Sequence, residues 1–498
     1  MAGNAVGFGN FLRFPGEAAA HGGGAFMIPY VIALVFLGIP LMWVEWALGR
    51  FGGTKGHGTS PGMFELIWRS RWAKYVGLLG VVLPFLTVIF YAYVESWTLA
   101  YSFFSADGTF AHLTSPQEFG DFFDNLLGAN GSYWPIYGFF VLTVLLNMVI
   151  MLRGISGGIE KFATFAMPTL FVLAIILVIR VLTLGAPLPD KCDQSVWNGL
   201  AFLWNPKFGE LTDMSLWLAA AGQVFFTLSV GFGVIACYAS YLRRDEDVVL
   251  SGLTTSAMNE FAEVVLGASL AIPLAFAFLG VDAVTEIAQQ AFALAFVSMP
   301  NLFLQMPFGQ VLSTLWFVLL FFAGVTSSIA LAQTVVAFVE DEYGCSRTKA
   351  VVLIWVVVFA CANLVIFGKG VTDELCFWVA TVGIVVFALL ELLVFVWLFG
   401  RKRAWDELNI GSDIRLPKAV YYIITYVTPL YLLGLLIAWS IQDGPRVAMM
   451  EGVSPEEVPW RWAARGLMVA VTAVAVVLIK WSRHLKADDV KDGGRAHE

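Results

Sequence analysis

The chain contains 498 residues, of which 59% are hydrophobic and 13% are charged, and its formal net charge is -8. Soluble globular domains carry about 25% charged residues, so this composition indicates an integral membrane protein. The cysteines form no C-x-x-C pair, and we predict neither a disulfide framework nor a transition-metal site. No basic run indicates a nucleic-acid partner.

Apolar runs long enough to cross a bilayer follow one another along the chain. A membrane-spanning helix needs about 20 apolar residues, whereas porin strands alternate over about 10 residues, and the runs here are continuous. Counting a broken stretch at the start as span 1, we predict spans 2 to 12 near residues 24–49, 75–104, 133–152, 162–183, 214–241, 250–280, 308–339, 350–367, 377–400, 419–441 and 462–482.

Lys and Arg residues mark one side of the predicted membrane protein. They gather in the connections between spans 2 and 3, 4 and 5, 6 and 7, 8 and 9, and 10 and 11, and in the tail. Because basic residues concentrate in cytoplasmic connections, we predict a multi-pass protein of the plasma (inner) membrane with both termini in the cytoplasm.

Two stretches place Gly-Phe-Gly inside a predicted span: "GNAVGFGNFLRFP" (3–15) and "GQVFFTLSVGFGVIACYAS" (222–240). Each begins a set of five spans, and because five is odd the second set enters the membrane from the opposite side. We therefore predict two inverted repeats, two appended spans and a cytoplasmic tail. Their boundaries are 1–183 for spans 1–5, 214–400 for spans 6–10, 419–482 for spans 11–12, and 483–498 for the tail.

A helix that breaks at membrane depth is tolerated where it lines a cavity or is buried in protein. The break frees N–H groups, which favour an anion such as a carboxylate, and carbonyl groups, which suit a cation. Two facing breaks would therefore bind a zwitterion and alkali ions, an inference already made for transporters with broken helices. The alternative is that the glycines only allow close helix packing.

The motifs "GNAVGFGNFLRFP", "GGGAFMIPY", "GIPLMWVEWALGR", "YVESWTL", "RGISGGIEKFA", "QVFFTLSVGFG", "SYLRRDEDVVLSGL" and "FFAGVTSSIA" cover almost the whole chain. With them the chain resembles the neurotransmitter:sodium symporters, bacterial leucine transporter type. The resemblance implies an all-α, LeuT-like fold with broken spans 1 and 6. Because the chain starts directly on the first motif, the first half of span 1 would be almost wholly missing, and we expect an upstream start.

The resemblance implies two sodium sites built from neutral oxygen atoms. In the first, the substrate carboxylate would join a carbonyl and three side chains, from Ala5, Asn10, Thr227 and Asn259. The second would use carbonyls and hydroxyls of Gly3, Val6, Ala323, Thr326 and Ser327. Outside its motif, "TSS" on a helix is more typical of a helix–helix hydrogen-bond patch.

The resemblance also implies an amino-acid site between the breaks. The N–H groups of Phe8 and Gly9 and the hydroxyl of Tyr91 would bind the carboxylate, and carbonyls of Ala5, Phe226 and Thr227 the amine. The pocket would be lined by Thr87, Tyr91, Phe226, Ser229, Phe232, Ser327 and Leu331. Thr87 and Leu331 replace a valine and an isoleucine of the leucine type, which leaves leucine, alanine, methionine and an aromatic residue open as substrates.

Glu263 follows Asn259 by one helical turn. Animal members of the family have serine there and require chloride, so we predict that Glu263 supplies the negative charge and makes transport chloride-independent. The alternative is a structural buried acid. Glu45 and Glu95 also lie at membrane depth, where charges are costly, and we expect them to support the unwound backbone.

The two gates depart from the family pattern. The outer gate pairs an arginine, here Arg13, with an acid whose position is held by Cys376, and Asp373 is the nearest substitute. The acid of the inner gate is Asp341, whose arginine partner would lie before Met1.

We therefore predict a sodium-coupled symporter of neutral amino acids that works by alternating access, with Na+ as coupling ion and no other cofactor. The alternatives are a non-transporting amino-acid sensor and a proton-coupled carrier of the same fold, against which Thr326 and Ser327 argue. A membrane enzyme is disfavoured because motifs such as H-E-x-x-H and G-x-S-x-G are absent. The oligomeric state, including a homodimer, stays open.

Overall fold

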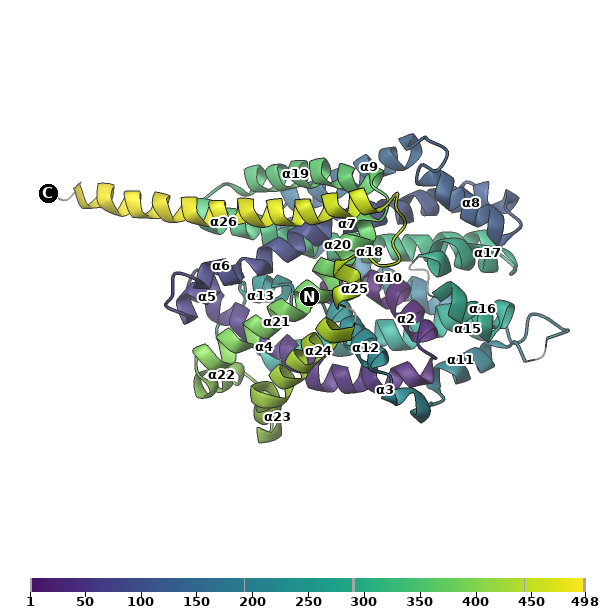
Figure 1. Ribbon diagram of the computed structural model, residues 1–498, viewed down its shortest axis with the longest axis horizontal. Coiled ribbons are helices and arrows are strands. Elements are labelled where there is room, and N and C mark those ends of the chain that lie inside the picture. Colours follow the sequence, from purple (N-terminus) through teal and green to yellow (C-terminus); the bar gives the residue numbers. More distant parts are fainter. Residues whose placement is uncertain (1, 192, 289–291, 443, 496–498) are drawn as a thin grey trace. The chain divides into compact units, whose positions relative to one another are not determined.

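The computed structural model describes residues 2–191, 193–288, 292–442 and 444–495, and its regular elements over these ranges are all helices (Figure 1). Ten of the described helices are long and apolar enough to cross a membrane. They confirm predicted spans 2–5 and 7–12 and cover Gly24–Gly53, Ala73–Ala106, Trp134–Leu152, Ile155–Leu182, Val248–Leu279, Gly309–Tyr343, Arg347–Phe367, Val371–Leu398, Lys418–Gln442 and Val458–Arg483.

The two remaining spans are broken, as the glycine motifs predict. In span 1, α1 (Ala2–Ala5) is followed by an interruption at residues 6–7, a π-helical turn η1 (Gly9–Arg13) and α2 (Phe14–Ala20). In span 6, α12 (Met214–Leu228) ends at Ser229, and α13 (Val234–Ala239) starts after three residues with positive φ. Those residues are Ser229 (55°), Gly231 (77°) and Gly233 (71°). Glycine adopts a positive φ without a steric penalty. Because residues with positive φ cannot continue a right-handed α-helix, the helix ends in mid-span.

The chain divides into two compact units, and the first comprises Met1–Ile39, Tyr91–Ser229 and Leu253–Ile329. It holds both halves of span 1 and the first half of span 6. Its further elements are α3 (Gly24–Ala33), η2 (Leu34–Gly38), η3 (Thr109–His112), α8 (Pro116–Leu126), α9 (Trp134–Leu152), η4 (Ile155–Glu160), α10 (Lys161–Leu182), α11 (Val196–Trp204), η5 (Phe208–Thr212), η6 (Phe261–Gly267), α15 (Ala268–Leu279), α16 (Val281–Ala288), η7 (Leu294–Ser298) and α17 (Met299–Leu304).

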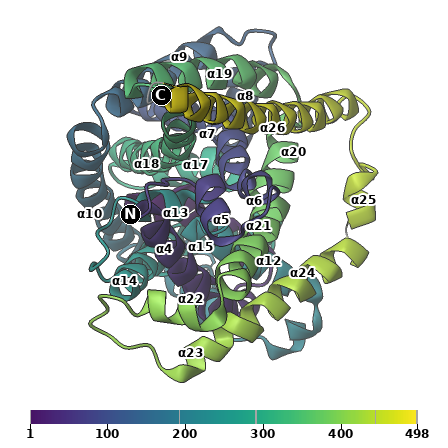
Figure 2. The same cartoon turned by 90° about the vertical axis from the view of Figure 1, so that its left-hand side faces the viewer.

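The second unit comprises Pro40–Phe90, Val230–Gly252 and Ala330–Glu498. In it, α5 (Ser60–Ile67) and α6 (Ala73–Gly77) pack against each other (Figure 2). Besides α13, it also holds most of α4 (Ile39–Gly53), α19 (Arg347–Phe367), α20 (Val371–Phe377), η8 (Trp378–Gly383), α21 (Ile384–Leu392), η9 (Leu393–Leu398), α22 (Arg401–Leu408), α23 (Lys418–Tyr422), η10 (Ile423–Val427), α24 (Thr428–Gln442), α25 (Gly444–Ala448) and α26 (Val458–Arg495).

Three helices run from one unit into the other: α7 (Leu79–Ala106), α14 (Val248–Glu260) and α18 (Gly309–Tyr343). Each unit draws helices from both predicted repeats, whose boundaries stay predictions. All residues of the two predicted sodium sites lie in the first unit.

Candidate functional site

Asn10 holds the broken backbone of span 1 through its side-chain oxygen. This oxygen accepts a hydrogen bond from the Gly7 N–H at 2.7 Å, and Asn10 is completely buried. The bond satisfies an N–H group that the interrupted helix leaves without a helical partner. Asn10 therefore stabilises the interruption itself.

The amide nitrogen of Asn10 faces the other predicted ligands of sodium site 1. It lies 3.0 Å from the hydroxyl of Thr227 and 2.8 Å from the Asn259 amide oxygen. That Asn259 atom also lies 2.9 Å from the carbonyl oxygen of Ala5. In the amide orientation that satisfies this contact, the Asn259 nitrogen occupies this position and donates to the Ala5 carbonyl. The structure thus brings all four predicted residues together.

Glu263 lies directly beside these residues, as its position one turn after Asn259 predicts. It is completely buried and accepts hydrogen bonds from Asn10 (3.0 Å), from the Gln223 amide (3.0 Å) and from the Tyr30 hydroxyl (2.9 Å). It also contacts the Thr227 hydroxyl. Among the described residues Glu263 forms no ion pair with a Lys, Arg or His side chain, so these neutral donors alone solvate its carboxyl group.

Sequence reasoning missed Tyr30 and Gln223. Gln223 precedes Thr227 by one helical turn, and its amide also donates to the carbonyl of Gly9 at 3.1 Å. Its place on the face of α12 that carries Thr227 was the available signal. Tyr30 ends the motif "GGGAFMIPY" and shares its hydroxyl with Glu260 at 2.9 Å.

Phe8, Tyr91 and Ser327 lie around the interruption of span 1. The Phe8 N–H donates to the Tyr91 hydroxyl at 3.2 Å, and the two rings stack with their centroids 4.6 Å apart. A Cβ atom added to Gly7 would lie 2.5 Å from the Ser327 hydroxyl and 2.9 Å from that of Tyr91. The absent side chain at Gly7 therefore leaves room for both hydroxyls close to the backbone of the interruption.

Span 1 also meets span 6 and α18 at the carbonyl of Asn4, which the sequence did not single out. This carbonyl accepts hydrogen bonds from Ser229 (3.3 Å) and Ser327 (3.4 Å). Half-buried Phe226 lies against Gly9, where an added Cβ would approach its ring to 3.1 Å. These contacts bring the unit 1 members of the predicted amino-acid site to the two breaks.

Part of the predicted sodium site 2 lies on one face of α18. The Thr326 hydroxyl is 3.1 Å from the carbonyl of Ala323, and Ser327 reaches α1 through Asn4. Asn4 is the neighbour of Gly3, and Val6 is fully buried in the interruption. The roles of the Gly3 and Val6 carbonyls stay predictions.

Three predicted pocket residues belong to the second unit and are all buried: Thr87, Phe232 and Leu331. Thr87 precedes Tyr91 by one turn on α7, and its hydroxyl donates to the carbonyl of Leu83 at 2.8 Å. Leu331 follows Ser327 by one turn on α18. Residues one turn apart share a helix face, and the lining of the pocket stays a prediction.

The gate residues have partners that the sequence analysis did not name. Arg13 lies 3.5 Å from Glu17 on its own helix, and its guanidinium lies over the Phe226 ring at 4.8 Å. Asp341 accepts a hydrogen bond from the Gly58 N–H at 2.7 Å. The pairing of Arg13 with Asp373 or at Cys376 stays a prediction.

Glu374, the residue after Asp373 on α20, forms ion pairs with two arginines. It lies 3.3 Å from Arg461 and 2.6 Å from Arg465, both on α26. Sequence reasoning did not single out this acid, which is buried beside Asp373.

The two other glutamates that the sequence analysis placed at membrane depth, Glu45 and Glu95, behave differently. Glu45 accepts a hydrogen bond from the N–H of Gly231 at 2.5 Å, which confirms that it supports the break of span 6. Glu95 instead bonds to the side chains of Asn147 (2.8 Å) and Ser328 (2.6 Å), so the same expectation for Glu95 is wrong. A carboxyl group at membrane depth takes whichever donors its helix face presents, and Glu95 faces α9 and α18.

A family model described as the sodium:neurotransmitter symporter family matches residues 1–120 and 124–486. A sodium-dependent transporter of Bacillus subtilis, YhdH, is 30% identical over 86% of this chain and 92% of its own length. The sodium-dependent nutrient amino acid transporter 1 of Drosophila melanogaster is 26% identical over 87% of this chain and 74% of its own. The crystal structure of MhsT in complex with L-phenylalanine superposes with a TM-score of 0.76, at 26% identity over 88% of this chain and 96% of that one.

Proposed function

Because the chain belongs to the sodium:neurotransmitter symporter family, we propose that it takes up a neutral amino acid together with sodium by alternating access. Its family and its fold are those of secondary transporters, so it is a sodium-dependent transporter with a LeuT-like fold and not an enzyme. The proposal extends this to the substrate, to the site residues and to uptake across the plasma (inner) membrane with both termini in the cytoplasm.

The observation that carries the proposal is the convergence of the Ala5 carbonyl with the side chains of Asn10, Thr227 and Asn259. A monovalent cation would fit among the carbonyl, hydroxyl and amide oxygens of these residues, because neutral oxygens are ligands that suit a hard ion. The substrate carboxylate would complete the coordination. Sodium would then raise the affinity for substrate, and substrate would raise the affinity for sodium by the same factor.

The substrate carboxylate would bind at Phe8, Gly9 and Tyr91. In support, the Phe8 N–H already faces the Tyr91 hydroxyl at 3.2 Å, a pair of groups suited to a carboxylate oxygen. The predicted lining carries hydroxyl, aliphatic and aromatic groups and no charged side chain. A neutral amino acid resembling leucine, alanine or methionine therefore fits this chemistry, in keeping with the relatives named for amino acids.

A second sodium would bind at Thr326, Ser327 and Ala323 with the carbonyls of Gly3 and Val6. Chloride would not be needed, because Glu263 supplies a negative charge at the position where chloride would otherwise bind. The four neutral donors around Glu263 support this assignment, since they would solvate a carboxylate as well as a chloride ion.

The test is binding of radiolabelled leucine to the purified protein in sodium and in potassium, with the other amino acids as competitors. We expect binding in sodium only, and the competitors that displace leucine would rank the substrates. Flux into vesicles with an imposed sodium gradient separates a transporter from a sensor. Equal binding in both salts would contradict sodium coupling through Asn10, Thr227 and Asn259.

A further inference from the structure

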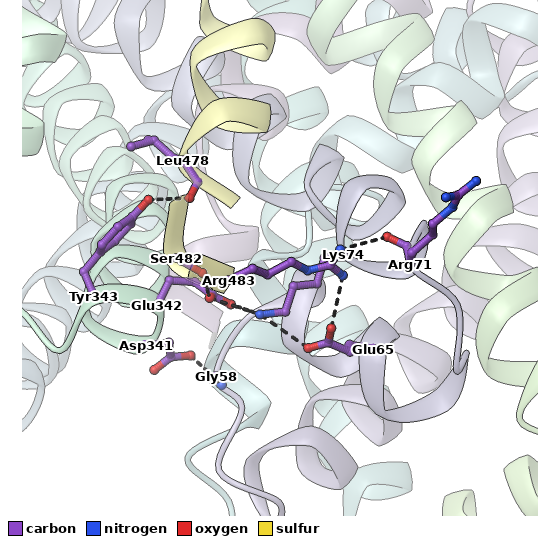
Figure 3. A network of polar contacts seen from close by, with 10 residues as sticks. All are labelled: Gly58, Glu65, Arg71, Lys74, Asp341, Glu342, Tyr343, Leu478, Ser482 and Arg483. Carbon is purple, nitrogen blue, oxygen red and sulfur yellow. Dashed lines mark hydrogen bonds and ion pairs between the residues drawn. The ribbon is translucent and has the colours of Figure 1, made fainter. Parts of the chain in front are cut away.

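A buried lysine on α6 joins this helix to α5 and to the end of α18, within the second unit (Figure 3). The Lys74 side chain on α6 is only 3% exposed. Its amine lies 2.8 and 3.0 Å from the two carboxylate oxygens of Glu342 near the end of α18, and 3.3 Å from Glu65 on α5. Glu342 is equally buried. A buried lysine with two carboxylate partners is charge-compensated and held in one position.

The end of α26 completes this network. The Ser482 hydroxyl donates to Glu342 at 2.5 Å, and Arg483 donates to Glu65 at 3.2 Å. Arg483 also donates to the carbonyl of Arg71, in the connection between α5 and α6, at 3.2 Å. The charges balance, because Lys74 and Arg483 face Glu65 and Glu342. We call Glu65, Lys74, Glu342, Ser482 and Arg483 the inner clasp.

The inner clasp lies next to a gate residue in the sequence. Asp341 immediately precedes Glu342 and accepts the hydrogen bond from the Gly58 N–H at 2.7 Å. Gly58 lies in the same connection as Lys74, two residues before α5. A Cβ atom at Gly58 would lie 2.9 Å from the Asp341 carboxylate, so this backbone fits closely against the acid. The connection is therefore attached to the end of α18 at two adjacent points.

We propose that the inner clasp positions the connection between α4 and α7 on Asp341, so that the end of α26 helps to hold the inner side closed. This rests on the proposed function, because it assumes transport by alternating access. Ser482 and Arg483 are positioning residues that act through Glu342 and Glu65. If the clasp forms only in the inward-closed state, its loss shifts the population toward the inward-open state.

Native Cys237 provides a measurement of inner opening. It is fully buried on α13, the second half of broken span 6. In a protein that keeps Cys237 as its single cysteine, the rate of modification by a membrane-impermeant thiol reagent, added on the cytoplasmic side, reports how often this helix is exposed. No substrate or sodium is needed for this measurement.

The test variants are Ser482→Ala and Arg483→Gln, which each remove few contacts and keep Lys74 paired with Glu342. We expect each to raise the modification rate of Cys237 about threefold to tenfold, in proportion to the population shift. The matched control is Ser440→Ala, because among the described residues the Ser440 hydroxyl bonds to the carbonyl of Leu436 in its own helix, at 2.7 Å. The control is expected to leave the rate unchanged.

Unchanged rates in both clasp variants would overturn the proposal. An equal rise in Ser440→Ala would overturn it too, because the change would then reflect general loosening. A rise that is confined to the clasp variants supports the proposal even if sodium-coupled flux is never found, so the failure of the proposed function would be recognised separately, by the binding and flux measurements.

Discussion

Two polar clusters, one buried and one partly buried, balance their charges in opposite ways. The ion cluster of the first unit, formed by Asn10, Thr227, Asn259 and Glu263, surrounds one carboxyl group with neutral donors. The inner clasp of the second unit pairs each carboxylate with a lysine or arginine of the chain. A cluster that already contains its cations is complete. The first cluster has no ion pair with a lysine, arginine or histidine among the described residues, and we therefore expect an ion to bind there and not at the inner clasp.

The largest expected effect comes from removing a ligand of the ion cluster. Asn259→Leu keeps the side-chain volume and removes the amide, and we expect sodium-dependent binding to weaken about 100-fold, a change of about 2.8 kcal/mol. The matched control is Asn363→Leu, since Asn363 bonds to backbone of its own helix. Sodium titration of both variants measures the difference. An unchanged sodium affinity in Asn259→Leu would contradict its role as a ligand.

Gly7→Ala tests the space at the break beside the cluster. The new methyl group would overlap the hydroxyls of Ser327 and Tyr91, and we expect substrate affinity to fall about 30-fold, or about 2 kcal/mol. Gly138→Ala on α9 is the control, because an added Cβ there meets nothing within 4 Å. Equal affinities of the two variants for the radiolabelled substrate would exclude a site at Gly7.

Glu263→Ser converts the ion cluster into one without its own negative charge. Without chloride we expect the variant to bind substrate about tenfold more weakly than the native protein, and added chloride should restore its affinity. The affinity of the native protein should be the same with and without chloride. Glu260→Gln, which alters the other carboxyl group at Tyr30, controls for local disturbance. A native protein that requires chloride would show that Glu263 does not replace the anion.

The Arg13–Glu17 pair is a partly exposed ion pair of the first unit, with side chains 22% and 27% accessible. Exposed pairs contribute at most about 1 kcal/mol, so Glu17→Gln is expected to change the substrate dissociation rate less than fivefold. Asp373→Asn is the comparison. A much larger effect of Asp373→Asn would identify Asp373 as the partner of Arg13 in the outer gate.

Much of the fold and part of the site followed from local sequence. The long apolar runs predicted the ten intact spans, because a bilayer requires continuous hydrophobic helices. Gly7, Gly231 and Gly233 predicted the two breaks, since their residue type permits the backbone that ends a helix. The convergence of Asn10, Thr227 and Asn259 was implied only by family resemblance, because the residues come from three separate spans.

Tertiary packing alone decided the rest. The sequence by itself determined which segments cross the membrane and where two of them break, because hydrophobicity and glycine conformation act over a few residues. It did not reveal that Tyr30 and Gln223 donate to Glu263, that Glu95 faces Asn147, or that Lys74 and Ser482 share Glu342. These partners lie far apart in the chain, and a polar side chain's partner is fixed only when packing brings a complementary group within hydrogen-bond distance.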